Sequence, residues 1–561
     1  MERGPGTEHT SVWWARRDQP PEPWESAPAQ FVEDQTCDLV VVGAGLTGLC
    51  TAVLLARRGV RPLVLEARHV AAGTTGHSTA KVSLLQGATY SGIAAHTDAE
   101  TAAAYAAAQA AGQRWLLDFC TESDVDVQRR DAWTYAVTSS GAQRVQREAQ
   151  ACALAGLAVE QSTSTELPFD VEAALRLPDQ AQLDPVGLCL ALRAEVEVLG
   201  GRVVEGVRVT GMNVGGSPHD TGPSSSGVLA SGGADATGIP DGSPLTEDDV
   251  DVEAPDRGRP AGDGERVVTL RTSAGEVRAR RVVVATGMPV LDRALYFARL
   301  QPQRSYALAF RLPDPATLPR GMYLSLDNPT RSLRTAPDGD RELLLVGGDN
   351  HVVGRSASPR AAVEDLDSWT RAHFPGAVRV HTWAAQDYES AGKLPIVGTM
   401  PRTHGSVLVA TGFNKWGMTN AAAAALILVG KLLGDDADEL PWARHLQRRT
   451  PSPRDLLSGL TFNASVGERL TRDWALRALP GRSGAAPHEG QGWVERGSIH
   501  PTATCTVAGT THRVEGVCPH LGGILSWNDS DLSWDCPLHG SRFTADGHCL
   551  EGPAVRDLES R

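Results

Sequence analysis

Two cysteine–histidine pairs far along the chain have the residue types and the spacing of a metal centre. Cys518 and His520 stand in CPHLGG, Cys536 and His539 stand in CPLHGS, and fifteen residues separate the pairs. If each pair gives one thiolate to a first iron and one imidazole to a second, the two loops hold a diiron centre with its ligands sorted by metal. A zinc finger instead pairs cysteine with cysteine and histidine with histidine, so the pattern favours the diiron centre over zinc.

A second informative group lies in CDLVVVGAGLTGLC, where Gly43, Gly45 and Gly48 join an apolar strand to a helix. The first glycine permits a tight turn, the second lets the backbone approach a pyrophosphate, and the third allows close helix packing. The N–H groups at the helix start favour the same negative charge. Glu66 ends the next apolar run, where its carboxylate can accept hydrogen bonds from a ribose. Together these features predict a dinucleotide site.

Two later segments are placed to return to that dinucleotide. RRVVVATGMPV, residues 280–290, is a buried-type strand that ends at Thr286 and Gly287. TGFNKWGMTNAAAAALIL, residues 411–428, is a glycine-bounded loop that opens a helix, and its N-terminal dipoles suit an electron-rich ring. The alternative for this segment is a helix cap with a packed Trp416. The sequence contains no second GxGxxG for a nicotinamide, which favours electrons taken from an organic substrate.

These three segments, and the order in which they occur, resemble those of the superfamily of FAD-dependent D-amino-acid oxidases and glycine oxidases. The resemblance covers roughly residues 36–435. The resemblance implies that the dinucleotide is FAD, with the late loop beside the isoalloxazine. The residues that it places at FAD are Gly43, Ala44, Gly45, Leu46, Thr47, Gly48, Glu66, Ala67, Arg68, Thr74, Val209, Thr286, Gly287, Gly412, Trp416, Gly417, Met418 and Thr419.

The stretch AAGTTGHSTAKVS, residues 71–83, resembles the segment of dimethylglycine and sarcosine dehydrogenases in which a histidine binds the flavin covalently. This resemblance nominates His77 as a catalytic residue, although Gly76 stands where those enzymes have a tryptophan. The alternative is a polar loop in which Thr74, His77 and their neighbours make ordinary hydrogen bonds. Lys415 is a second candidate, because a cation beside the ring would stabilise an anionic reduced flavin.

Candidates for the substrate side are the cations and phenols of the segments expected to roof the flavin. Tyr306 is our third catalytic candidate, and Arg304 or Arg334 could hold a substrate carboxylate with a bidentate guanidinium. Surface charges and buried core tyrosines are the alternative for each of them. The full set comprises Arg304, Tyr306, Arg331, Arg334, Tyr388 and Lys393.

The cysteine–histidine motifs, together with EGPA at 551–554, resemble Rieske [2Fe-2S] domains over about residues 490–561. The resemblance implies that Cys518, His520, Cys536 and His539 hold the cluster and that EGPA covers it.

Several positions depart from respiratory-type Rieske domains, which carry a disulfide between the two cluster loops. Gly523 and Leu538 occupy the positions of its cysteines, so no half-pair is left, and Cys505 and Cys549 are expected to be buried thiols. Ser541 matches the serine that bonds to a cluster sulfide. Phe543 replaces a tyrosine, and the loss of a hydrogen bond predicts a lower reduction potential.

The length of 561 residues predicts several domains. The expected fold class is an α/β Rossmann-like FAD-binding domain with a mixed-sheet substrate domain, followed by a small all-β Rieske domain. The strand-like flanks of one Gly/Ser/Asp-rich segment indicate a disordered insertion in a hairpin. The expected ranges are an arm, 1–35; nucleotide-binding segments, 36–87, 185–299 and 395–436; substrate segments, 88–184 and 300–394; the insertion, 213–265; a linker, 437–489; and the Rieske domain, 490–561.

A formal net charge of −14 disfavours nucleic acid and acidic membranes as partners. The N-terminal residues lack a basic and then apolar secretory pattern, and the scattered cysteines suit a reducing compartment, so we expect a cytoplasmic protein without a membrane span.

The expected function is oxidation of an amine or amino-acid-like substrate, with electrons passed singly through the cluster to an unidentified acceptor. Electron delivery from cluster to flavin for a reductive or oxygen-using reaction stays open, as does a redox-sensing binding protein.

Overall fold

The computed structural model describes residues 10–17, 35–215, 267–290, 296–434, 440–447, 453–477, 486–495 and 500–561. The predicted insertion, 213–265, lies outside the described residues from position 216 onward, and so does most of the predicted arm, 1–35. Among the residues described, no helix has both the length and the hydrophobicity that crossing a bilayer requires.

A largely parallel sheet carries the turn with the three glycines, and its strands follow the order β16-β17-β10-β1-β2-β7. Strands from β17 to β7 are parallel, whereas β16 is antiparallel to β17. The antiparallel pair β8 and β9 flanks the predicted insertion and joins the sheet at β10. The bounds are β1 Gln35–Val42, β2 Leu63–Leu65, β7 Arg202–Val204, β8 Val209–Val214, β9 Val268–Thr272, β10 Gly275–Val284, β16 Ile396–Thr399 and β17 Val407–Thr411.

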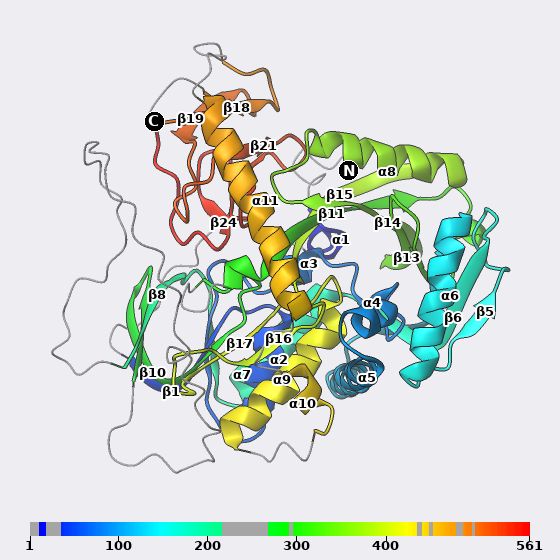
Figure 1. Ribbon diagram of the computed structural model, residues 1–561, viewed down its shortest axis with the longest axis horizontal. Coiled ribbons are helices and arrows are strands. Elements are labelled where there is room, and N and C mark those ends of the chain that lie inside the picture. The colour runs from blue at the N-terminus through cyan, green and yellow to red at the C-terminus, as the bar shows by residue number, and fades with distance from the viewer. Residues whose placement is uncertain are drawn as a thin grey trace.

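Helices rich in small residues pack beside this sheet. The helix α2 contacts both α7 and α9, and α5 contacts α9 (Figure 1). Close approach explains the small residues: a Cβ on Gly112 of α5 would lie 2.3 Å from the carbonyl oxygen of Thr419 in α9. The bounds are α2 Leu46–Ala56, α5 Ala99–Glu122, α7 Pro185–Val198 and α9 Gly417–Leu433.

The second sheet is mixed and has the order β15-β11-β14-β13-β12-β4-β6-β3, with β5 beside β6. Only the β12–β4 pair is parallel among these described strands. Leu366 of α8 packs into the core that Leu308 and Phe310 of β11 form on one face. The bounds are β3 Lys81–Val82, β4 Val127–Ala136, β5 Glu160–Ser162, β6 Ala173–Leu183, β11 Leu300–Arg311, β12 Met322–Ser325, β13 Arg331–Asp338, β14 Arg341–Val352, β15 Val378–Ser390, α4 Thr89–His96, α6 Ser139–Leu154 and α8 Pro359–His373.

The C-terminal module has two small antiparallel sheets and a core of its own, which includes Trp534 and Phe543. With it, the three parts of the predicted fold class are all present. The bounds are β18 Gly492–Val494, β19 Thr502–Val507, β20 Thr510–Glu515, β21 Ser526–Asn528, β22 Ser533–Asp535, β23 Arg542–Phe543 and β24 Cys549–Glu551.

The predicted linker contains a short helix, α10 Ala443–Leu446, and a long one, α11 Pro453–Arg477. In Figure 1, α11 runs from the neighbourhood of α9 to the C-terminal module. At one end Asp455 lies 2.6 Å from Nε2 of His96, and at the other Trp474 donates to the carbonyl oxygen of Gly522 over 3.0 Å. The helix therefore connects the two halves through side-chain contacts.

The described part of the N-terminal arm, residues 10–17, packs on the body through α1 Val12–Ala15. Trp13 is fully buried and donates its indole N–H to the carbonyl oxygen of Ser78 over 2.8 Å. Ser11 bonds the carbonyl oxygen of Gly76 over 2.7 Å. The arm therefore supports the segment that contains the candidate His77.

Candidate functional site

The turn after β1 is shaped by glycines that no other residue could replace without movement of the backbone. Gly43 has φ of 105°, and a Cβ on it would lie 2.7 Å from the carbonyl oxygen of Ala285. A Cβ on Gly48 would lie 1.9 Å from the carbonyl oxygen of Gly43. The backbone therefore approaches closely where a pyrophosphate is expected.

Glu66 follows β2 and fixes the neighbouring backbone. Its carboxylate accepts from the Ala44 N–H over 2.8 Å and from the Arg68 N–H over 2.9 Å. Burial lowers the pKa of the Arg68 guanidinium, and this effect exceeds the opposing influence of nearby carboxylates. Glu66 and Arg68 both line a cavity that begins at the glycine turn.

That cavity has a volume of about 520 Å³ and extends from the glycine turn to residues of the second sheet. Ala44, Gly48 and Thr419 do not line it, and Thr419 is instead buried in hydrogen bonds with Gln86 and Gln109. The predicted residues that line it are Gly43, Gly45, Leu46, Thr47, Glu66, Ala67, Arg68, Thr74, His77, Val209, Thr286, Gly287, Tyr306, Tyr388, Gly412, Lys415, Trp416, Gly417 and Met418. A single cavity that joins a glycine turn, an acidic residue and a helix N-terminus fits FAD.

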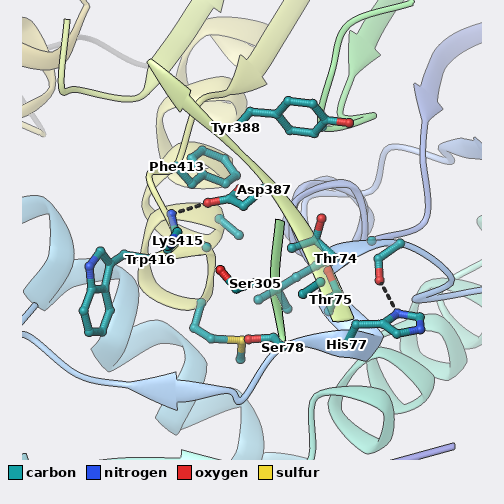
Figure 2. A pocket seen from close by; sticks show the side chains of 18 of the residues that line it. Thr74, Thr75, His77, Ser78, Ser305, Asp387, Tyr388, Phe413, Lys415 and Trp416 are labelled. Atoms are coloured by element: carbon teal, nitrogen blue, oxygen red, sulfur yellow. Dashed lines mark hydrogen bonds between the residues drawn. The ribbon is translucent and has the colours of Figure 1, made fainter. Parts of the chain in front are cut away.

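The loop before α9 presents positive groups to the cavity. Asn414 and Lys415 have φ of 51° and 71°, and the Lys415 N–H donates to the carboxylate of Asp387 (Figure 2). The Lys415 side chain is accessible from the cavity but set deep among protein atoms, which lowers its pKa to about 8. Burial raises the pKa of Asp387. The loop thus combines a cation with the N-terminus of α9.

His77 ends the short helix α3 Thr74–His77 and lies on the opposite side of the cavity view from Trp416 (Figure 2). Its Nδ1 is 2.9 Å from the carbonyl oxygen of Gly73. Burial lowers the pKa of His77 to about 4, so the ring is neutral at pH 7. A Cβ on Gly76 would lie 2.8 Å from Nε1 of Trp14, so the arm occupies the space that a larger residue there would need.

Two buried phenols also line the cavity. The hydroxyl of Tyr306 has no hydrogen-bond partner within the described ranges, whereas that of Tyr388 accepts from Gln386 over 3.0 Å. Burial raises the pKa of both tyrosines, so both stay protonated. Tyr306 therefore has a free hydroxyl for a bound molecule.

The arginines predicted for a substrate carboxylate do not line the cavity. Arg304 pairs with Asp531 of the C-terminal module, with 2.7 Å from its Nε to the carboxylate. Arg334 is buried against the Trp13 ring and donates to backbone carbonyl groups. Arg331 forms ion pairs with Asp349 and with Asp365.

Two cations that the sequence did not single out for this role line the substrate-side part of the cavity instead. Lys81 of β3 donates to the carbonyl oxygen of Tyr323 and to Ser332, over 2.7 and 2.6 Å. Burial, with help from a nearby arginine, lowers its pKa to about 7. Arg144 of α6 donates to the carbonyl oxygen of Leu326 over 2.6 Å. Arg144 lies in no recognisable motif, and Lys81 lies in the segment of His77 but was not singled out there, so only the tertiary structure shows that both line the cavity.

The predicted cluster ligands converge from two loops. The His520 and His539 rings are 5.2 Å apart between centroids, and a hydrogen bond from Cys536 lowers the pKa of Cys518. A Cβ on Gly523 would lie 2.9 Å from Sγ of Cys536. Two thiols and two imidazoles, with no room for a side chain at position 523, fit a [2Fe-2S] cluster with two protein ligands on each iron.

The residues around these ligands are buried. Ser541 accepts from the Ala554 N–H over 3.0 Å, and its hydroxyl also bonds the Cys518 thiol. Cys505 and Cys549 are free buried thiols, as expected, and burial raises their pKa values to about 12 and about 11.

The ligand loops face the flavin-side domain. The Phe297 ring lies 4.8 Å from that of His539 and 5.5 Å from that of His520, measured between centroids. The side-chain amide of Gln386 in β15 donates to the carbonyl oxygen of Gly540 over 2.8 Å, and the backbone carbonyl oxygen of Gln386 accepts from Thr74 in the cavity wall. A single residue therefore contacts both predicted cofactor sites.

Comparisons with known proteins agree with these sites. Residues 38–246 and 249–430 match the family model described as FAD dependent oxidoreductase, and residues 496–560 match that of the Rieske [2Fe-2S] domain. The Bacillus subtilis protein YhfW, named as a Rieske 2Fe-2S iron-sulfur protein, is 28% identical over 534 residues, which cover 94% of each chain. The cytochrome b6-f complex iron-sulfur subunit of Synechococcus sp. (strain JA-3-3Ab) is 44% identical over 46 residues, 8% of this chain and 27% of that one.

Two solved structures share the fold of the larger part. L-proline dehydrogenase from P. horikoshii has a TM-score of 0.53 at 15% identity and covers 74% of this chain and 100% of its own. Glycine oxidase from Geobacillus kaustophilus has a TM-score of 0.52 at 15% identity and covers 75% of this chain and 100% of its own. At this identity the likeness shows the fold alone.

Proposed function

Because this chain belongs to the FAD-dependent oxidoreductase family and also carries a Rieske domain, we propose that it oxidises an amine or amino-acid-like substrate. The electrons then leave singly, through the Rieske domain, to a separate acceptor. The cofactors are FAD and a [2Fe-2S] cluster. When bound, FAD supplies two-electron chemistry and the cluster supplies one-electron chemistry.

The observation that carries this proposal is the position of the cluster ligands against the domain with the FAD cavity. Both ligand histidines pack on Phe297, and Gln386 contacts the loop of His539 as well as the cavity wall. Direct contact between the two cofactor-binding domains favours the exchange of electrons between them. L-proline dehydrogenase and glycine oxidase share the fold of the larger part, and their names support an amino-acid-like substrate for this chain.

On the substrate side, we assign the role of the carboxylate-binding residue to Arg144. It lines the cavity, and a guanidinium fork matches a carboxylate in two hydrogen bonds. Lys81 also lines the cavity and has a pKa of about 7, so its charge depends on conditions near neutrality. Of the two, Arg144 is therefore the better candidate for a fixed contact with a carboxylate.

Near the ring, the side chains have complementary tasks. Lys415 provides a positive charge, and Tyr306 offers a hydroxyl to orient the substrate. Neutral His77, with Nδ1 donating to the Gly73 carbonyl oxygen, keeps Nε2 as a proton acceptor. The sequence resemblance that nominates His77 for covalent flavin attachment stays a prediction.

An anaerobic screen of amino acids and amines tests the proposal, with absorbance followed at the flavin and cluster bands. We expect flavin bleaching by a carboxylate-bearing amine and then cluster reduction. In Arg144→Met the KM for that substrate should rise by about tenfold to a hundredfold, and Arg144→Lys should recover part of the loss. If no amine bleaches the flavin while a reduced cluster does, the electron flow runs the other way.

A further inference from the structure

The Rieske domain supplies part of the wall of the FAD cavity. Leu550, Glu551 and Gly552, at the end of β24 and just after it, line the same cavity as the glycine turn. Arg208, which also lines it, donates to the carbonyl oxygen of Cys549 over 2.8 Å. A Cβ on Gly552 would lie 3.5 Å from a side-chain methyl of Val290. The two domains thus meet at the cavity itself.

Glu551 has an unusual environment there. Its Oε2 is buried and has no hydrogen-bond partner anywhere in the described ranges. The charge of Glu551 raises the pKa of Arg68 more than any other group does, although burial lowers that pKa by a larger amount. A buried carboxylate oxygen without a donor is costly, and Arg68 compensates only its charge. The position therefore calls for a donor from a molecule in the cavity.

The same loop reaches the cluster ligands. Three residues after Glu551, the Ala554 N–H donates to Ser541, whose hydroxyl bonds the Cys518 thiol. Residues 550–554 therefore have one end in the FAD cavity and the other beside a predicted cluster ligand.

From these observations we propose that Glu551 accepts a hydrogen bond from a hydroxyl or amino group of FAD. The FAD site then includes the Rieske domain, and retention of FAD depends on that domain being docked. This inference concerns binding alone and holds whichever way electrons flow and whatever the substrate is.

The test compares Glu551→Ala with Glu559→Ala in the full-length protein. Glu559 belongs to the same domain, but its side chain is exposed and pairs on the surface with Arg556. FAD is titrated into protein from which flavin has been removed, and its fluorescence gives the Kd. We expect Glu551→Ala to weaken FAD binding by at least about tenfold and Glu559→Ala to leave it within about twofold of wild type.

The iron content and the EPR spectrum of the reduced cluster should be the same in both variants, which separates a lost FAD contact from an unfolded Rieske domain. If Glu551→Ala does not fold, Glu551→Gln keeps the side-chain size and replaces a charged acceptor by a weaker neutral one. A loss of about threefold or more then supports the proposal. FAD affinity within about twofold of wild type in the variant that folds overturns it. If the flavin is covalently bound, the titrations use a His77→Ala background.

Discussion

The two cofactor sites of this chain are built in opposite ways. The predicted cluster site comes from two short loops with four side chains as its predicted ligands, and the same domain contains buried ion pairs of Arg542 with Asp535 and Asp531. The FAD cavity is assembled from segments between Val42 and Gly552, and backbone and small residues supply much of its wall. The difference teaches that the cluster site depends on which side chains are present, whereas the FAD site depends as much on where side chains are absent.

The largest effect should come from loss of a cluster thiolate. We expect Cys536→Ser to abolish iron binding and the EPR signal, because two loops with three ligands cannot complete both irons. FAD should still be present, since Cys536 does not line the cavity.

The matched control is Cys505→Ser, because Cys505 is a buried thiol of the same domain that is not one of the predicted ligands and that donates to the carbonyl oxygen of Ala545. Iron analysis should find wild-type content in this variant. An equal loss of iron in both variants would show that the site depends on domain packing rather than on ligand identity.

Addition of a side chain, rather than removal of one, should empty the FAD site. Gly43→Ala adds one methyl group where φ is 105° and where that group would lie 2.7 Å from a carbonyl oxygen, so the turn must move. We expect FAD to be lost on purification while the cluster spectrum persists. Gly59→Ala is the control, because Gly59 also has positive φ, 81°, but has no atom within 4 Å of the added carbon. Retention of FAD in Gly43→Ala would contradict a site shaped by close backbone approach.

These differences also explain what the sequence could predict. Cluster ligands two or three residues apart, and glycines within one turn, leave a local pattern because neighbours in sequence are neighbours in space. The fold class was confirmed for the same reason, since strand, turn and helix signals are local. The cavity residues Ala67, Thr74 and Val209 came from family resemblance rather than from a pattern of their own.

The substrate side could not be predicted in this way. Arg304 and Arg334 occur in β11 and β13, and the direction of each side chain depends on which partner strand and which domain covers it. Arg304 meets Asp531 from a segment more than two hundred residues away, and Arg334 meets the Trp13 ring of the arm. Arg144 faces the cavity only because α6 packs where it does.

The buried charges between the domains provide a third test. In Asp531→Ala, Arg304 and Arg542 lose a carboxylate while their side chains stay 5% and 8% exposed. A buried ion pair that loses one partner costs about 3–5 kcal/mol in the free energy of unfolding. Urea denaturation followed at the cluster band should show this loss. Asp38→Ala, which removes an exposed pair with Arg280, should cost at most about 1 kcal/mol. If both variants lost the same free energy of unfolding, the stability of the Rieske domain would not depend on these buried ion pairs.

The smallest expected effect concerns Lys415, where the FAD site does depend on a side chain. Its pKa is lowered by burial from 10.5 to about 8, so the lysine is charged at pH 7 and loses its charge as the pH rises through about 8. If that charge supports an electron-rich reduced ring, flavin reduction by substrate should slow with a midpoint near that pH. Lys415→Met should be slower at pH 7 by about tenfold to a hundredfold and lack this titration.

Lys415→Arg is the control for that experiment, because it should stay charged and keep its rate to higher pH. The same shift has a consequence for stability. Because the unfolded chain holds this proton up to about pH 10.5, wild-type stability should gain a rising contribution between pH 8 and 10.5 that Lys415→Met lacks. A rate that titrates near pH 8 in both wild type and Lys415→Met would assign the titration to another group. In that case the FAD cavity would act through its backbone alone at this position, and its contrast with the cluster site would be sharper than we infer.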